Sequence, residues 1–529
     1  MRPRRGGPGL KVAATGQRAS AASLARPPAF RGSFRAAPAT LAAHSVSAGP
    51  FSIRPTAVAV PSDAEDVQTL ITWAARQGTP VVPRGGASGL PAGNVGAWLA
   101  VDLVPGLGEI GNVDLTTGTL RCGAGAGAAT VARVASRAGL AFPPLPSSAE
   151  RCTIGGMVAN NAAGARSFRH GATREWLAAL DVVWPDGSRS SIEAGPDTAP
   201  TWSRELAADL SARLGGTVQD HGWPRVRKNS SGYALDRFLP GGDALQLMVG
   251  SEGTLGIVVG ATLRLTPQPE ERGVLLVGLP FLDSIPSASS AAAEANASAC
   301  ELFGRRLLDM AGLAVDPLVR DAAQGAAAVV LLEVEGDPGQ VESGLAILKR
   351  WADEEGVGSV AATDEEGQER LWKIRHAASP LIARTAERGR RSTQFIEDSV
   401  VPVAAVPNYL RGVSDILERA GTEAVIFGHA GDGNIHVNPL MDLRALDRRT
   451  RVRTILEETV ALVVGLGGTL SGEHGDGRVR APFVDRIWSP ELVSVFREVK
   501  ERLDPDGLMN PGVILPLPGQ DPLEGLWAD

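Results

Sequence analysis

The stretch PTAVAVPSDAEDVQTLITWAARQGTPVVPRGGASGL, residues 55–90, alternates short apolar runs with one amphipathic segment and ends in glycines. The runs at 53–61 and 79–86 predict strands, and residues 63–78 predict a helix with Asp63 as its N-cap. Strand, helix and strand in this order are typical of an α/β unit. We therefore expect the second strand to run directly into a glycine loop at residues 83–90.

This glycine loop, PRGGASGL, has the composition of an anion-binding loop. Glycines let the backbone approach a phosphate closely and turn several N–H groups toward it. The loop is not a P-loop, because no Gly-Lys-Ser/Thr follows it. Taken alone, it fits a tight turn as well as a ligand site.

A second strand–loop–helix pattern follows at residues 118–144. Its loop GAGAGA, residues 123–128, formally matches the dinucleotide fingerprint G-x-G-x-x-A. No acidic residue lies about 20 positions further on to hold a ribose hydroxyl, because the nearest, Glu150, lies beyond a proline-rich break. We interpret this loop as a turn that packs a helix. Residues 177–193 then predict two strands around a Pro-Asp-Gly turn, and residues 243–267 predict more strands.

The pattern changes after Pro267, where predicted helices alternate with short strands. Helices are expected at 301–310, 340–355 and 443–466, and strands at 326–336 and 424–431. The glycine- and proline-rich stretch after Glu473 resembles the first part again. The sequence thus predicts four parts: a disordered tail at 1–28, a first domain at 29–267, a second domain at 268–470, and a C-terminal segment at 471–529 that returns to the first domain.

Composition excludes several classes of protein. The chain has 529 residues, of which 43% are hydrophobic and 21% charged, which is ordinary for globular domains. No apolar run reaches the length of about 20 residues that a bilayer requires. The net charge of −7 argues against a nucleic-acid partner. Cys122, Cys152 and Cys300 are too few and too scattered for an iron–sulfur cluster or a disulfide framework, which favours a reducing compartment.

The N-terminal residues are basic, and the first acidic residue is Asp63. Such a composition is shared by an organelle transit segment, a disordered tail and an over-long start. The same Ala/Arg/Gly bias persists through the whole chain, so targeting is the weaker interpretation. We expect a cytoplasmic protein, with peripheral attachment to the inner membrane as an alternative.

Three further stretches are rich in glycine, small residues and amide side chains: 144–171, 226–235 and 249–258. Long polar loops in compact domains are usually functional. Several loops of this kind can together wrap a large, elongated cofactor.

Histidines and one glutamate occur in two glycine-flanked motifs. FGHAGDGNIHVN carries His429 and His436 on opposite arms of a predicted hairpin, which can aim both imidazoles into one pocket. GTLSGEHGDGR supplies Glu473 and His474 after a predicted helix. Two histidines and a glutamate with open positions form a catalytic pattern for a divalent first-row metal. In the alternative interpretation, each histidine is only a hydrogen-bonded loop residue, or the nearby aspartates 432 and 476 are ligands or turn formers.

Together, the motifs PRGG-x-SGL, TIGGM-x-ANNA-x-G, KN-x-SGY, VGSEGTLGI, GH-x-GDGN-x-H, GEHGDG and NPG-x-I give a family resemblance. In this order the chain resembles the FAD-linked D-2-hydroxy-acid dehydrogenases, from about residue 52 to 515. These include D-lactate dehydrogenases, the flavin subunit of glycolate oxidase and D-2-hydroxyglutarate dehydrogenase, all of the vanillyl-alcohol-oxidase type of flavin fold. The resemblance implies an α+β protein, in which a two-subdomain FAD-binding domain carries an inserted α+β cap domain.

The resemblance also implies which residues contact FAD. They are Pro83, Arg84, Gly85, Gly86, Ala87, Ser88, Gly89, Leu90, Pro146, Thr153, Gly155, Gly156, Asn160, Gly164, Glu252, Gly253, Gly256, Ile257 and Asn510. Non-covalent FAD is expected, because the first loop has no histidine and His170 stands where the family usually has a tyrosine. The chain departs from the family pattern at Ala234, where an aspartate is usual, and at Ala48-Gly49-Pro50, where another aspartate is missing.

The implied chemistry is oxidation of a small D-2-hydroxy acid, of the D-lactate, glycolate or D-2-hydroxyglutarate type, to the 2-oxo acid. Removing the hydroxyl proton is easier when a metal lowers its pKa and a positioned base accepts it. By resemblance, His429, His436 and Glu473 hold a divalent ion (Zn, Mn or Fe), His474 is the base, and the hydride goes to flavin N5. Arg375 is the implied partner of the substrate carboxylate, with a surface arginine as the alternative, and Lys373 and Arg84 are weaker candidates.

Electrons must then pass to a separate acceptor: a quinone, cytochrome c, an electron-transfer flavoprotein or an iron–sulfur subunit. A homodimer is compatible with the sequence. Two rival interpretations are a flavin lyase or transferase of the alkylglycerone-phosphate synthase type and a non-catalytic electron-transfer subunit. The histidine and glutamate motifs argue against the first, and the second requires that these residues do not converge.

Overall fold

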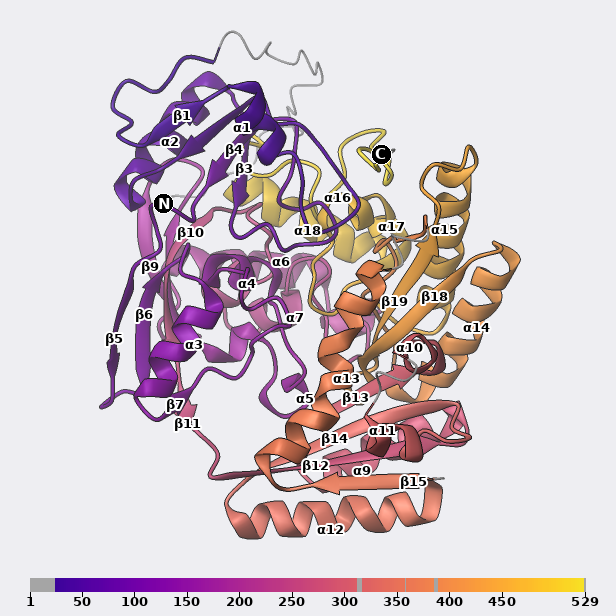
Figure 1. The fold of residues 1–529 in the computed structure, drawn as a ribbon. Coiled ribbons are helices and arrows are strands. Elements are labelled where there is room, and N and C mark those ends of the chain that lie inside the picture. The colour runs from indigo at the N-terminus through magenta and orange to yellow at the C-terminus, as the bar shows by residue number, and fades with distance from the viewer. Residues whose placement is uncertain (1–23, 312–315, 357, 385–388, 528–529) are drawn as a thin grey trace.

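A computed structural model of the chain describes residues 24–311, 316–356, 358–384 and 389–527 (Figure 1). Most of the predicted tail, residues 1–23, lies outside the described residues. Phe30 is already part of the core, because only 2% of it is exposed and it packs with the first sheet. Among the described residues, no helix combines the length and the apolar character needed to cross a bilayer.

The first subdomain is the α/β unit expected from residues 55–90. Its sheet has the order β1-β2-β4-β3, in which β2, β4 and β3 run parallel. Helix α2 (Ala64–Gln77) covers it and begins at Asp63, whose carboxylate accepts from the Asp66 N–H, as predicted. The strands are β1 (Ser33–Arg35), β2 (Ala57–Val60), β3 (Val81–Arg84) and β4 (Leu99–Asp102), with α1 (Pro38–Ala43) beside them. Strand β3 therefore delivers the PRGG loop at its carboxyl end.

The second subdomain is an antiparallel sheet of order β5-β6-β10-β8-β9. Its strands are β5 (Ile110–Asp114), β6 (Thr119–Gly123), β8 (Leu177–Val183), β9 (Arg189–Glu193) and β10 (Ile257–Arg264). The GAGAGA loop joins β6 to α3 (Ala128–Arg137), as predicted for a turn that packs a helix. A Cβ atom at Gly125 would lie 2.5 Å from the Leu103 carbonyl oxygen, so this turn is in close contact with protein. Helices α6 (Thr201–Leu214) and α7 (Leu235–Phe238) and the small strands β7 (Leu140–Ala141) and β11 (Thr266–Pro267) complete it.

Two stretches of this subdomain differ from the expectation. The predicted polar loop at 144–171 contains α4 (Ile154–Asn160) and α5 (Ser167–His170), because the Thr153 hydroxyl accepts from the Gly156 N–H and caps α4. The predicted strand at the start of 243–267 is α8 (Ala244–Met248), capped by the Asp243 carboxylate. In α4 and α8, a side-chain cap at the N-terminus stabilises a short helix.

The cap domain is built on an eight-stranded sheet of order β15-β12-β14-β13-β18-β19-β16, with β17 also pairing β19. Its strands are β12 (Glu271–Leu279), β13 (Ala299–Gly304), β14 (Ala328–Gly336), β15 (Gly358–Ala362), β16 (Arg391–Ser392), β17 (Ser399–Val400), β18 (Glu423–His429) and β19 (Asn434–Met441). Its helices are α9 (Ile285–Glu294), α10 (Arg305–Ala311), α11 (Pro317–Ala322), α12 (Pro338–Glu355), α13 (Glu365–Arg384), α14 (Val406–Arg419) and α15 (Arg448–Gly465).

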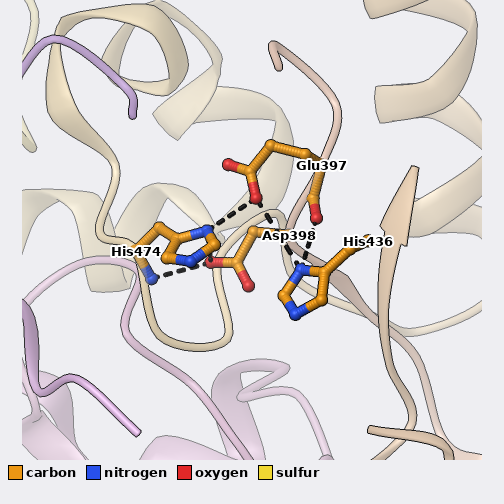
Figure 2. A group of neighbouring side chains, drawn as sticks. All are labelled: Glu397, Asp398, His436 and His474. Carbon is orange, nitrogen blue, oxygen red and sulfur yellow. Dashed lines mark hydrogen bonds and ion pairs between the residues drawn. The ribbon is translucent and has the colours of Figure 1, made fainter. Parts of the chain in front are cut away.

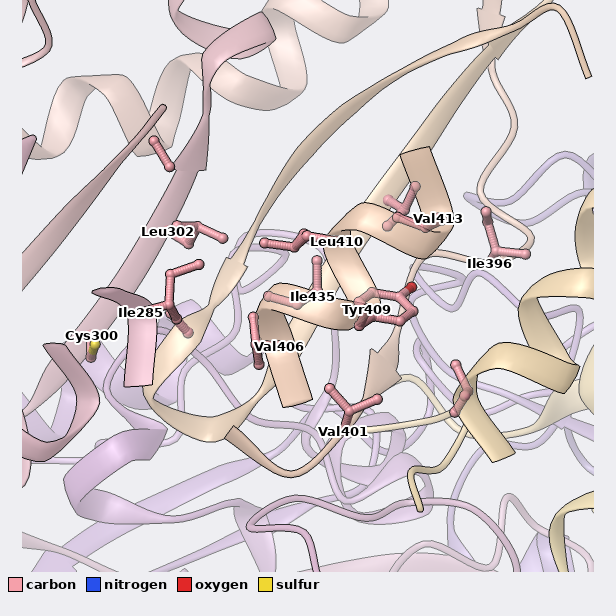
Figure 3. Packing of buried hydrophobic residues seen from close by; sticks show 14 of the residues in the cluster. Ile285, Cys300, Leu302, Ile396, Val401, Val406, Tyr409, Leu410, Val413 and Ile435 are labelled. Carbon is pink, nitrogen blue, oxygen red and sulfur yellow. The ribbon is translucent and has the colours of Figure 1, made fainter. Parts of the chain in front are cut away.

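The expected helix at 301–310 is wrong in its first part, because residues 299–304 form β13 and α10 begins only at Arg305. Residues 299–303 are buried on both faces and pair with β14 and β18, and this tertiary pairing overrides local helix preference. Figure 3 shows the core on one face of the sheet, where Val406, Leu410 and Val413 of α14 pack near Leu302 and Ile435. This core holds β13, β18 and β19 in place, and these strands carry the site described below.

The C-terminal segment returns to the two subdomains of the first domain. It contains α16 (Gly477–Arg480), α17 (Val484–Ile487) and α18 (Pro490–Leu503), and Phe496 and Val499 of α18 are buried against the second subdomain. Met509 forms a bridge with Val81, beside the first sheet. Figure 1 shows this segment lying between the two subdomains and the cap.

Candidate functional site

A cavity of about 890 Å³ lies where the glycine loops of the first domain face the cap. Cap residues Phe427, Asn438 and Arg391 contribute to its wall, together with Glu473 and His474 of the C-terminal segment. Most of the FAD contacts expected from the sequence line this one cavity: Pro83, Arg84, Gly85, Gly86, Ala87, Ser88, Gly89, Leu90, Pro146, Thr153, Gly155, Gly156, Asn160, Glu252, Gly253, Gly256 and Ile257. Loops more than 150 residues apart in sequence thus form a single elongated site.

The PRGG loop offers a row of backbone donors to this cavity. Within the part of the chain that the structure describes, the N–H groups of residues 85–89 have no protein acceptor. Glycine is required at one of these positions, because a Cβ atom at Gly86 would lie 1.8 Å from the Arg151 carbonyl oxygen. Successive backbone N–H groups without acceptors suit a phosphate or pyrophosphate. The loop therefore fits the pyrophosphate of FAD.

Two of the expected FAD contacts do not line the cavity. A Cβ atom at Gly164 would lie 1.9 Å from the Leu145 carbonyl oxygen, so this glycine allows two loops to approach each other. The amide of Asn510 donates to the carbonyl oxygens of Gly93 and Glu252 and accepts from Arg478. Both residues act on the loops that form the cavity wall and have no exposed face on the cavity itself.

His429 and His436 lie on one face of the β18–β19 hairpin, as the GHxGDGNxH motif predicts. Side chains alternate along a strand, so His429 and Phe427 share a face of β18. His436 pairs directly with Phe427 across the hairpin, which places its ring beside His429. The ring centroids of the two histidines are 5.2 Å apart. Gly433 permits the tight connection, with a φ of +71° and no room for a Cβ beside the Val401 carbonyl oxygen at 2.1 Å.

Glu473 reaches the same point from the C-terminal segment. Its Oε1 lies 3.3 Å from Nε2 of His429 and 3.6 Å from Nε2 of His436. All three side chains are buried, with at most 6% of any residue exposed. Nε2 of His474 lies 3.8 Å from the same Oε1, and its ring stacks on His436.

The loop that carries Glu473 and His474 is held by the buried carboxylate of Asp398. Oδ2 of Asp398 accepts from the backbone N–H groups of Gly472, Glu473 and His474, at 2.9, 3.1 and 2.9 Å. The Ser471 hydroxyl donates to the same oxygen. One carboxylate thus fixes the conformation of the whole GEH turn.

Two further glutamates orient the histidines. Oε1 of Glu301 lies 2.5 Å from Nδ1 of His429, because the β13–β18 register places residue 301 opposite residue 429. The main-chain oxygen of Glu397 accepts from Nδ1 of His436 at 2.8 Å, and its Oε2 lies 2.6 Å from Nδ1 of His474 (Figure 2). With Nδ1 donating in each ring, the Nε2 lone pairs point toward Glu473.

This donor set fits a divalent cation. The Nε2 atoms of His429 and His436 and Oε1 of Glu473 are electron-pair donors within 4.8 Å of one another. Such donors repel one another unless a cation or protons lie between them, and His₂Glu is a common set for a catalytic first-row metal. Asp432 lies outside this set, because it accepts from Ser167 and Arg227.

A second acidic group near His436 does not suit a metal. It contains Glu397, Asp398, His474 and His436 itself. Asp398 already accepts four hydrogen bonds through Oδ2 and one from Asn434 through Oδ1. Glu397 is bound by His474 and by Arg480. These carboxylates are occupied by protein donors, so they act as a frame for the histidines.

Glu301, Glu473 and Glu397 are each bound to a lysine or an arginine in addition to histidine. Arg375 Nε donates to Glu301 at 3.0 Å, Lys228 Nζ lies 2.8 Å from Oε2 of Glu473, and Arg480 contacts Glu397. Arg375 also stacks on Phe427, with 4.8 Å from its Cζ to the ring centroid. Among the described residues the cavity wall includes Phe427 and Arg391 but not Arg375. The structure therefore brings Arg375 to the histidine cluster through Glu301.

These pairs control the charges of the site. Burial raises the pKa of Glu473, but Lys228 and His429 outweigh it and hold that pKa well below its usual value. Burial lowers the pKa of His474, but Glu397 and Asp398 outweigh it and raise that pKa to about 9. Burial likewise opposes the ionisation of Glu301, and His429 and Arg375 hold its pKa below the usual value. These glutamates are therefore held ionised beside the histidines, and each has a lysine or arginine that balances its charge.

Sequence reasoning missed Glu301, Glu397, Asp398, Lys228 and Arg480. One local signal was available for Glu397 and Asp398, because two adjacent acids interrupt the apolar stretch FIEDSVV at 395–401. A buried strand that contains charged residues needs partners for them. Lys228 stands in the KN-x-SGY motif, but its partner Glu473 is 245 positions away.

Residues 55–192 match the family model described as FAD binding domain, and residues 268–514 match the model described as FAD linked oxidases, C-terminal domain. The chain is 32% identical over 475 residues to a D-2-hydroxyglutarate dehydrogenase from Xanthomonas citri pv. viticola, covering 87% of this chain and 89% of that protein. It is 30% identical over 466 residues to a D-lactate dehydrogenase from Archaeoglobus fulgidus, covering 87% and 91%.

A further relative is the glycolate oxidase subunit GlcD from Bacillus subtilis, 29% identical over 472 residues, covering 87% of this chain and 89% of that protein. Among solved structures, an alkyldihydroxyacetonephosphate synthase matches with a TM-score of 0.64 and 14% identity, covering 90% of this chain and 83% of the other. A 4-ethylphenol oxidase from Gulosibacter chungangensis matches with a TM-score of 0.64 and 15% identity, covering 91% and 94%. At this identity the structures show the fold alone, and the vanillyl-alcohol-oxidase type of fold predicted from the sequence is confirmed.

Proposed function

We propose that this chain oxidises a small D-2-hydroxy acid with the help of a divalent metal ion. The proposal starts from the family, because the chain belongs to the FAD-linked 2-hydroxy-acid dehydrogenases. The chain is an FAD-linked oxidoreductase that acts on a hydroxy acid. The metal, the stereochemistry and the residue roles are our proposal.

One observation carries this proposal. The Nε2 atoms of His429 and His436 and a carboxylate oxygen of Glu473 converge, while Glu473 and the adjacent His474 line the cavity formed by the glycine loops. One proposed metal ligand, Glu473, and the proposed base, His474, thus line the space in which FAD and a substrate would meet. A non-catalytic electron-transfer subunit would not need this arrangement.

The residues of this chain supply positioning and a proton acceptor. His429, His436 and Glu473 would hold the ion, which when bound would lower the pKa of the substrate hydroxyl, while bound FAD would accept the hydride from Cα. His474 would take the hydroxyl proton at Nε2, because its Nδ1 is bound to Glu397. A neutral imidazole is required, and a nearby divalent cation opposes the effect of the carboxylates that raise the pKa of His474.

Two arginines are candidates for the substrate carboxylate. Arg375 was expected in this role, and its Nε is bound to Glu301. Arg391 belongs to the cavity wall. A guanidinium has five donors, so Arg375 can bind Glu301 and still offer other N–H groups to a carboxylate. We keep Arg375 as the proposed partner, with Arg391 as the second.

The test of the function is anaerobic reduction of the bound flavin, which needs no knowledge of the natural acceptor. D-lactate, glycolate and D-2-hydroxyglutarate should be compared, with the L-enantiomers of the chiral acids as controls. We expect at least one D-acid or glycolate to bleach the flavin absorbance, and the L-acids to leave it unchanged. Bleaching by the L-acids alone, or by none of these acids, would contradict the proposal. The electron acceptor, proposed to be a separate quinone, cytochrome c, electron-transfer flavoprotein or iron–sulfur subunit, can then be screened with the reduced protein.

The metal is tested separately from the flavin. Chelation should abolish flavin reduction by the hydroxy acid and leave the flavin spectrum nearly unchanged, because the proposed ligands lie in the cap and C-terminal segment and not in the glycine loops. Adding back Zn²⁺, Mn²⁺ or Fe²⁺ should restore the reaction. His429→Ala should reproduce the effect of chelation and should not be restored by metal. Full activity of a protein shown by elemental analysis to be metal-free would rule out the metal.

A further inference from the structure

Glu397 contacts both His436 and His474 (Figure 2). Its main-chain oxygen accepts from Nδ1 of His436, and its carboxylate oxygen Oε2 lies 2.6 Å from Nδ1 of His474. Nε2 of His436 and Nε2 of His474 are both directed to Oε1 of Glu473, at 3.6 and 3.8 Å. One residue thus determines which nitrogen of each ring is available.

Glu397 is itself held rigidly. Its Oε1 is bound to Arg480, whose other nitrogen contacts the main-chain oxygen of Gly475. Glu397 and Arg480 are almost fully buried, with side-chain exposures of 2% each. Residues 399 and 400 pair with β19, which fixes the backbone beside Glu397. A buried carboxylate that is held on one side by a guanidinium has little freedom to leave the histidine on its other side.

We propose that Glu397 is the positioning residue for the proton acceptor, because it keeps His474 in the tautomer that carries a proton on Nδ1. This inference rests on the proposed function and goes beyond it. In the reaction, the substrate O–H bond breaks and an N–H bond forms at Nε2 of His474. The electron pair of the O–H bond forms the carbonyl as the hydride leaves Cα for FAD. The proton on Nδ1 stays in place, and the carboxylate of Glu397 stabilises the imidazolium that results.

The chain offers a matched control for this role. Glu335 is also a buried carboxylate bound to a histidine and an arginine, with Oε1 at 2.5 Å from Nε2 of His170 and Oε2 at 3.0 Å from Nε of Arg272. Neither Glu335 nor His170 lines the cavity of the site, within the described residues. Glu335→Gln therefore removes the same kind of contact without touching the proposed chemistry.

The first measurement is the rate constant of anaerobic flavin reduction at saturating substrate. We expect Glu397→Gln to lower it by about 10²–10⁴-fold, with less than a threefold change in the substrate concentration at half saturation. Glu397→Asp, which keeps the charge beside Arg480 but withdraws from His474, should lower it less. Glu335→Gln should keep it within about twofold. A normal rate per bound FAD in the Glu397 variants would overturn the proposal, even if less FAD were bound.

Two safeguards keep the result decisive. If both single variants fail to hold FAD, Glu397→Gln combined with Arg480→Met removes both charges of the buried pair. Proteins tolerate this change better than one unpaired buried charge.

The second measurement is the ¹⁵N spectrum of the seven imidazoles in the wild-type protein, with His474 assigned by His474→Ala. A proton on Nδ1 in the wild type, lost in Glu397→Gln, supports the proposal. A neutral wild-type His474 that carries its proton on Nε2 instead of Nδ1 overturns it. This spectrum also decides the positioning if no hydroxy acid reduces the flavin, in which case the proposed function alone has failed.

Discussion

Two buried glutamate–histidine–arginine groups in this chain are almost the same in their contacts and differ in their surroundings. Glu397 lies 2.6 Å from His474 and is bound to Arg480, whereas Glu335 lies 2.5 Å from His170 and is bound to Arg272. In the first group the bound nitrogen is Nδ1, and Nε2 faces Glu473 and the cavity. In the second group the bound nitrogen is Nε2, and the ring packs edge-on against Trp176 at 6.0 Å.

A tight carboxylate–imidazole pair is therefore not in itself a sign of catalysis. Such a pair satisfies a buried charge wherever it occurs. It can serve proton transfer only where the remaining ring nitrogen faces the reacting groups. The arginines differ as well, because the side chain of Arg480 is 2% exposed and that of Arg272 is 38% exposed.

The largest expected difference between the two groups is in turnover. His474→Ala should lower the rate of flavin reduction by about two to four orders of magnitude, the usual contribution of a positioned base. The metal and the flavin should remain bound, because His474 is not among the proposed ligands. His170→Ala should leave the rate within about twofold. Stopped-flow absorbance measures both, and equal losses in the two variants would remove the distinction between the groups.

A second difference should be seen in stability. Arg480→Met leaves Glu397 buried without its guanidinium, and breaking a buried pair in this way costs about 3–5 kcal/mol. Arg272→Met breaks a pair whose arginine is partly in solvent, and it should cost about 1 kcal/mol or less. The urea midpoint of unfolding, followed by flavin release, compares the two. If Arg272→Met is the more damaging variant, the burial argument is wrong.

The smallest expected effect is the pH dependence contributed by Glu335. Burial raises the pKa of this carboxyl, but His170, Arg272 and Arg166 outweigh it and lower that pKa to about 2. A group with a depressed pKa stabilises the folded state above its unfolded pKa, about 4.3, and loses this effect as the pH falls toward 2. Glu335→Gln should therefore destabilise the protein by up to about 3 kcal/mol at pH 6, and by less at pH 3. Urea midpoints at the two pH values check this, and a gap that widens in acid would reverse the sign.

Much of the site could be predicted from local patterns. Polar groups of the proposed site stand within a few residues of a bend that glycine makes possible. This holds for the PRGG loop, the GHxGDGNxH hairpin and the GEH turn. The order of these motifs was enough to indicate the fold and the family, and both are confirmed. The convergence of His429 and His436 follows from strand alternation alone.

The orienting residues could not be predicted in the same way. Glu301 meets His429 across 128 positions of sequence, and Glu397 meets His474 across 77. Glu301 does not differ in its local pattern from Glu333, which lies on the neighbouring strand β14 and binds Arg166. The acidic pair at residues 397–398 indicates buried charges but not which partners they meet. The prediction of a helix at residues 301–304 is wrong for the same reason, because pairing with β14 and β18 makes this segment a strand.

By itself, then, the sequence determined the glycine turns, the histidine hairpin and the succession of helices and strands, since these depend on φ/ψ preference and on the spacing of apolar residues along the chain. Only the tertiary structure decided which charges meet, and hence which nitrogen of His474 is available and that Arg375 binds Glu301. The reason is that a buried charge is stabilised by partners from other segments of the chain. The residues next to it in sequence do not indicate which partners these are.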